Sequence, residues 1–88
     1  MPTQAPTMAD EVRKLARDRY VTPARTAGNP TVEINVGAVH KAMGYKDRIP
    51  LVATALSAMK FRKENNLTLL RTHGPGQSTT TRFVFALN

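Results

Sequence analysis

The sequence predicts a small α+β domain in which three helices pack on a small antiparallel sheet. Residues 38–61 are typical of two helices joined by a tight turn, and residues 67–87 of two strands joined by a loop. A third, short strand is predicted over residues 31–36, where apolar and polar residues alternate. Residues 8–88 would form this domain. Residues 1–7, with two prolines and two threonines, are expected to be a disordered tail.

A first helix is predicted to begin near Met8, with Thr7 as its N-cap. Asp10 lies in the first turn, where a negative charge is favourable beside the positive end of the helix dipole. We expect the helix to end before Pro23, because proline disrupts a helix interior. Residues 22–30 then have the composition of a loop.

The central pair of helices is predicted from the signals at the turn between them. Residues 38–43 form the first helix, and Gly44 follows where a C-cap favours a residue that tolerates positive φ. Asp47 is expected to cap the second helix, which is predicted over residues 48–61. Two short helices joined in this way form a helix-turn-helix layout. Apolar residues at spacings of three and four indicate the buried face of the second helix: Ile49, Val52, Ala53, Leu56 and Met59.

The C-terminal part predicts a β-hairpin. Strands are expected over residues 67–73 and 79–87, and alternation places Phe83 and Phe85 on one face of the second strand. Between the strands lie turn residues, GPGQS at 74–78, in a loop longer than a two-residue turn.

The net charge is the strongest compositional signal. Thirteen Lys and Arg residues against six Asp and Glu give +7, and a strongly basic small domain favours a nucleic-acid partner. The alternative is that the charge serves only solubility. The chain has no cysteine, which fits a reducing compartment. Because no apolar run is long enough for a membrane span and no secretory signal is present, we expect a cytoplasmic protein, or a nucleoid-associated or nuclear one when bound to DNA.

Catalysis and metal binding find little support in the sequence. His40 and His73 have no carboxylate partner close in sequence, and the six acidic residues are scattered. The glycines of residues 74–78 lie between two strands, so they do not form a phosphate-binding loop. No group of residues has metal-ligand spacing. We therefore expect no enzyme activity, no cofactor, no metal and no small-molecule substrate.

The order helix, short strand, helix, turn, helix, strand, loop, strand resembles the winged helix-turn-helix DNA-binding domains. The resemblance covers about residues 8–88 and rests on KAMGYKDRIPLVATAL and on the hairpin LTLLRTHGPGQSTTTRFVF, which would be the wing. It implies double-stranded DNA as the partner and residues 48–61 as the recognition helix, which would enter the major groove. The chain would then serve in a transcription regulator or as the targeting module of a larger assembly.

The resemblance places the DNA contacts at the two ends of the recognition helix and on the wing. The middle of that helix carries no Arg, Asn or Gln, the residues best shaped for base contacts, so phosphate contacts should dominate, with limited base reading by Lys46 and Arg48. Lys60 also fits a structural role at the negative end of a helix dipole. The candidate DNA-binding residues are Lys41, Lys46, Arg48, Thr54, Ser57, Lys60, Arg71, Gln77, Ser78, Thr79 and Arg82.

A protein-interaction module is the alternative function. Pro50, Leu51 and Ala58 would give the second helix an apolar outward face, and a fold alone does not settle function. A homodimer or a larger protein assembly would bury that face. RNA binding is a third possibility that only the charge supports, because the sequence lacks the paired aromatic motif of an RNA-recognition sheet and its aromatic residues at 83 and 85 are expected in the core.

Overall fold

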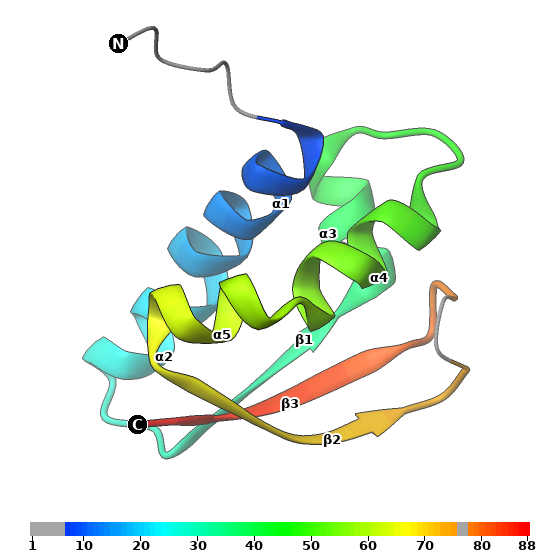
Figure 1. The fold of residues 1–88 in the computed structure, drawn as a ribbon. Coiled ribbons are helices and arrows are strands. Elements are labelled where there is room, and N and C mark those ends of the chain that lie inside the picture. Colours follow the sequence, from blue (N-terminus) through cyan, green and yellow to red (C-terminus); the bar gives the residue numbers. More distant parts are fainter. Residues whose placement is uncertain (1–6, 76–77) are drawn as a thin grey trace, which may run out of the picture.

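The computed structural model describes residues 7–75 and 78–88, and it shows an α+β architecture (Figure 1). Helices cover one face of a three-stranded antiparallel sheet with the strand order β1-β3-β2. Residues 1–6 of the predicted tail, and Gln77, lie outside the described residues. Within the part described, none of the helices combines the length and the apolar character needed to cross a bilayer.

The first helical stretch begins as the sequence predicts. Helix α1 (Met8–Ala16) has Thr7 as its N-cap. The Thr7 hydroxyl accepts a hydrogen bond from the Asp10 backbone N–H at 3.1 Å, and the Asp10 carboxylate accepts one from the Thr7 N–H at 3.2 Å. Two N–H groups that the first turn leaves without partners are satisfied in this reciprocal way, which stabilises the start of the helix.

The prediction that this helix ends before Pro23 is wrong. The chain continues through a π-helical segment, η1 (Arg17–Val21), into α2 (Thr22–Thr26). The backbone N–H of Thr22 donates to the carbonyl of Arg17, five residues back, so the turn is wider than an α-turn just before the proline. Pro23 then lies in the first turn of α2, where its missing N–H costs little. The predicted loop is reduced to residues 27–30.

Strand β1 (Thr31–Asn35) leads directly into α3 (Val36–Met43). The Asn35 side chain accepts a hydrogen bond from the backbone N–H of Ala38 at 2.7 Å and caps the helix. The helix therefore begins two residues before its predicted start, and Val36 belongs to it rather than to the strand. Gly44 ends the helix in the left-handed region with φ 71°, which confirms the predicted C-cap.

The predicted second helix, residues 48–61, is two helices. Helix α4 (Ile49–Ser57) stops at Ala58, whose ψ of 144° is extended, and α5 (Met59–Asn65) begins after it. The break turns Phe61 into the core, where its ring packs edge-on against Phe85 with centroids 5.6 Å apart. It also turns Met59 outward. Its predicted place on the buried face is wrong, since 62% of this residue is exposed.

Asp47 does not cap α4 as predicted. The N-cap position is Arg48, and no side chain makes a capping hydrogen bond there. Asp47 instead adopts φ 56° in the turn, a left-handed conformation that few residues other than glycine, Asn and Asp adopt. Its carboxylate is therefore not used by the helix that follows.

The sheet is completed by β2 (Leu67–His73) and β3 (Arg82–Leu87). β3 lies between the other strands and pairs antiparallel with both, with Ile34 opposite Phe83 and Val32 opposite Phe85. The second strand of the hairpin starts at residue 82, so the prediction of strand over residues 79–81 is wrong. The inner face of the sheet and the helices share one core, whose largest fully buried apolar side chains are Phe61, Phe85, Ile34, Leu56, Val12, Val21, Val36, Val39 and Val52.

The connection between the hairpin strands is tied to the start of α3. The backbone N–H of Val36 donates to the carbonyl of Thr81 at 2.8 Å, and Thr81 is fully buried. At Gly37 the approach is so close that an added Cβ would lie 2.4 Å from the carbonyl oxygen of Thr79. Only glycine permits this contact, so Gly37 fixes where the base of the hairpin sits relative to the helices.

Candidate nucleic-acid interface

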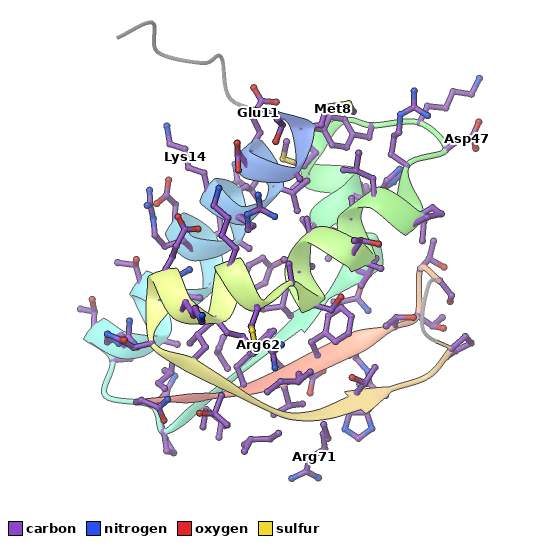
Figure 2. The ribbon with its side chains drawn as sticks, viewed as in Figure 1. Met8, Glu11, Lys14, Asp47, Arg62 and Arg71 are labelled. Carbon is purple, nitrogen blue, oxygen red and sulfur yellow. The ribbon has the colours of Figure 1, made fainter. Side chains whose placement is uncertain are left out.

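Three of the predicted DNA-binding cations lie around the turn between α3 and α4. Lys41 is in the last turn of α3, Lys46 is in the turn, and Arg48 is the N-cap of α4. All three are exposed, and none forms an ion pair within residues 7–75 and 78–88. Asp47 projects from the same turn at one edge of the molecule (Figure 2). We call Lys41, Lys46 and Arg48 the cationic corner.

The turn is held by contacts from α3 and α1. The backbone N–H of Arg48 donates to Nε2 of His40 at 3.1 Å. The His40 ring packs edge-on against Tyr45, with centroids 6.4 Å apart. The Tyr45 hydroxyl donates to the carboxylate of Glu11 on α1 at 3.4 Å. Burial raises the pKa of Tyr45, and the negative charge of Glu11 and this hydrogen bond raise it further. Tyr45 packs against the core.

The outward face of α4 is small and without charge. Pro50 and Thr54 are exposed, and Leu51 is half-buried. Ser57 is half-buried as well, and its hydroxyl donates to the backbone carbonyl of Thr54 at 3.3 Å. A shallow hollow between α1 and α4 borders this face, with a lining that includes Ala9, Leu51, Ala55 and Ala58.

Lys60 lies away from the cationic corner. It is in the first turn of α5, and its ammonium group is 3.3 Å from the carboxylate of Asp10, which also accepts a 2.6 Å hydrogen bond from Arg13. The Arg13 guanidinium, the Thr7 N–H and Lys60, in that order, hold the pKa of Asp10 well below its usual range. A role of Lys60 at the negative end of a helix dipole does not fit a first-turn residue.

Arg71 and Arg82 lie on the outer face of the sheet. Phe83 and Phe85 face the core, so the alternating residues Arg82 and Val84 face outward. Arg71 pairs in register with Val84 and faces the same way. Figure 2 shows Arg71 pointing away from the helices. The guanidinium of Arg82 is 3.3 Å from the carboxylate of Glu33 on β1. Neither arginine shares a face with α4.

The hairpin connection uses Ser78 largely for its own turn. The Ser78 N–H donates to the hydroxyl of Thr81 at 3.1 Å, and the Ser78 hydroxyl accepts from the Thr80 N–H at 3.0 Å. The hydroxyl of Thr81 in turn donates to the carbonyl of Pro75. Thr79 is exposed. Its side chain is therefore better placed for an external contact than that of Ser78.

The structure thus brings only part of the predicted site together. The corner and the outward face of α4 are continuous along the chain, whereas Lys60 belongs to the contact of α1 with α5, and the two arginines belong to the outer sheet face. Sequence reasoning missed the role of His40, because a hydrogen bond to a backbone group eight residues away leaves no sequence pattern.

No group of three or more His, Asp or Glu side chains in the described part of the chain is arranged to hold a metal ion. No protein-family model matches the chain, and comparison with curated proteins and with solved structures found no significant match.

Proposed function

We propose that this chain is a winged helix-turn-helix domain that binds double-stranded DNA mainly through phosphate contacts. The order of its elements supports the assignment of the fold: the helical stretch of α1, η1 and α2, then β1, α3, the turn, α4 with α5 after it, and the hairpin of β2 and β3. β3 lies in the middle of the sheet. In this class of domain the second helix of the motif enters the major groove and the hairpin reaches the flanking backbone. In this chain α4 would be the helix in the major groove, and the connection between β2 and β3 would reach the backbone.

The cationic corner is the observation that carries the proposal. Lys46 and Arg48 lie at the leading end of α4 and Lys41 on the helix before it, all exposed and without an ion pair in the described residues. The leading end is the part of a recognition helix that reaches the DNA. No side chain caps that end, so the backbone N–H groups of Ile49 and Leu51 add to the positive potential there. Phosphate oxygens are the partners that fit such a site.

The outward face of α4 sets the kind of recognition. Its small side chains, Pro50 and Thr54 among them, allow the helix to approach the groove closely. They offer no bidentate partner for a base, so direct base contacts fall to Lys46 and Arg48. The proposed function is therefore DNA binding with modest sequence preference, as part of a transcription regulator or as the targeting module of an assembly.

Arg48→Ala tests the docking face. We expect binding to a duplex to weaken by about fivefold to tenfold, because a charge-assisted phosphate contact is lost, and the salt slope to become shallower by about one. Lys14→Ala is the matched control, since Lys14 is exposed, forms no ion pair in the described residues and lies far from the corner (Figure 2). Fluorescence anisotropy measures both variants, and equal losses would show that the docking face is misassigned.

A protein-interaction role is the second candidate, and the hollow beside α4 favours it. Leu51, Ala58 and the partly exposed Met8 supply apolar surface on the same side as the proposed DNA face. A partner seated there would exclude DNA. Sedimentation velocity measures whether the chain associates with itself through this face. A homodimer that Leu51→Asp dissociates would support the interaction role. A monomer at all concentrations would count against self-association.

A further inference from the structure

We propose that His40 is a positioning residue that holds the cationic corner in its DNA-binding arrangement and releases it when the imidazole is protonated. This inference rests on the proposed function, because the corner is the surface offered to DNA. It starts from the 3.1 Å hydrogen bond between the Arg48 backbone N–H and Nε2 of His40. A merely exposed histidine would make no such contact.

The hydrogen bond defines the form of the ring. Nε2 accepts a hydrogen bond only when it carries a lone pair, so this contact requires a neutral imidazole with its hydrogen on Nδ1. The edge-on contact with Tyr45 keeps the ring in this orientation, and the hydroxyl of Tyr45 is fixed in turn by Glu11. His40 therefore connects α3 to the N-cap residue of α4 through a contact that exists in one protonation state only.

The turn needs this restraint. Gly44 and Asp47 both adopt positive φ, and Asp47 does so without a capping role that would stabilise it. The backbone N–H of Arg48 points to His40 and has no other acceptor within the described residues. Without the imidazole, the segment that carries Lys46 and Arg48 loses the only side-chain hydrogen bond that ties it to α3 in that part of the chain.

Protonation reverses the contact. Both ring nitrogens of a histidinium ion are donors, so Nε2–H would face the N–H of Arg48. The new positive charge would also lie beside the backbone N–H of Arg48, and Lys41 follows His40 in the sequence. The other titratable groups in this network are Tyr45, against the ring, and Glu11, which binds the Tyr45 hydroxyl from α1. The bond is therefore lost in acid, and the turn relaxes. Histidine is the side chain that ordinarily changes charge between about pH 5 and pH 8.

The sign of the effect separates positioning from simple electrostatics. Added positive charge alone strengthens binding to phosphates, so electrostatics predicts tighter DNA binding as the pH falls. Loss of the positioned corner predicts weaker binding. We expect the affinity to fall by about threefold to tenfold between pH 8 and pH 5.5 at fixed ionic strength, which is the fold-change that corresponds to one hydrogen bond.

The experiment uses the two histidines of the chain. Anisotropy titrations with one duplex compare the unaltered protein, His40→Gln and His73→Gln at about pH 8 and about pH 5.5, with circular dichroism to confirm folding. The glutamine oxygen occupies a position similar to Nε2 and accepts the Arg48 N–H at both pH values. We expect the acid-induced loss to persist in His73→Gln and to disappear in His40→Gln.

An acid-induced loss that persists in His40→Gln, or a wild-type affinity that rises in acid, would overturn the inference. If His40→Gln fails to fold, the backbone amide resonance of Arg48 in the unaltered protein decides, because it must shift with the titration of the His40 ring. Absence of DNA binding at both pH values would instead refute the proposed function, and the Arg48 resonance would still show whether the hydrogen bond is lost in acid.

Discussion

Gly37 shows how much of the hairpin's position depends on a single residue. A methyl group at this site would overlap the carbonyl oxygen of Thr79. Alanine usually stabilises a helix relative to glycine by about 1 kcal/mol. Gly37→Ala is expected to do the opposite and lower the free energy of unfolding by about 1–3 kcal/mol, because backbone rather than a flexible side chain must move. Urea unfolding measures the change, and a gain in stability would contradict the proposed contact.

Asp10 gives a prediction with a definite pH dependence. Its pKa is lowered in the folded state, so the stability that it contributes is complete above the unfolded value of about 4 and is lost as the pH falls toward the folded value. Asp10→Asn should therefore lower the melting temperature at pH 7, and the gap from the unaltered protein should narrow below about pH 4. Asp18→Asn is the control, because Asp18 pairs only with its exposed neighbour Arg17 among the described residues. A gap of constant size would contradict the prediction.

At the scale of secondary structure, Arg25 links three chain segments that are distant in sequence. Its guanidinium group, on α2, donates to the carbonyl oxygen of Asn65 at 2.8 Å and approaches those of Asn66 at 3.5 Å and Asn88 at 3.4 Å. The end of α5 is thereby neutralised by a cation where the helix dipole is negative. This contact joins α5, the helix that contains Phe61, to α2.

Arg25→Ala should lower the free energy of unfolding by about 1 kcal/mol, a value reduced because the contact is partly exposed. Arg19→Ala is the matched control, since Arg19 is exposed and makes no side-chain hydrogen bond or ion pair in the described residues. Thermal unfolding of the two variants compares them directly. Equal and negligible changes would show that the cap contributes nothing.

The elements that sequence predicts best are those specified by local signals. These signals depend on residues that are a few positions apart in the sequence. The structure confirms the Thr7 cap, the Gly44 C-cap and the alternation in the strands. The break at Ala58 could not be predicted in this way. It depends on Phe61 reaching Phe85 across the core, a contact between residues 24 positions apart, and tertiary packing overrides a helical period.

In the candidate site, too, local sequence predicts some positions and distant contacts decide the others. Positions near the turn, Lys41, Lys46 and Arg48, come together because their elements are adjacent in sequence. The structure separates Lys60, which pairs with Asp10 across α1 and α5, from this group. It likewise separates the outer-face residue Arg71, since the side of a strand that a residue faces depends on register, and a bulge between Leu69 and Arg71 alters that register.

For the whole molecule, the +7 charge matters less than its distribution. Asp10, Asp18 and Glu33 each neutralise at least one cation, whereas those of the cationic corner are unpaired in the described part of the chain. Under the proposed function, these exposed cations would favour docking with the leading end of α4 toward the phosphates. Under the two proposed functions, a protein partner seated in the hollow beside the same helix would compete with DNA for this face.

The central claim is that this domain docks on DNA through phosphate contacts, and one titration tests it most directly. Fluorescence anisotropy with a random-sequence duplex, at two or more salt concentrations, gives the affinity and its salt slope. Contacts with about five phosphates predict micromolar binding with a log–log slope of about −4 to −5. A folded protein that does not bind at low salt, or that binds with a slope near zero, would contradict the claim.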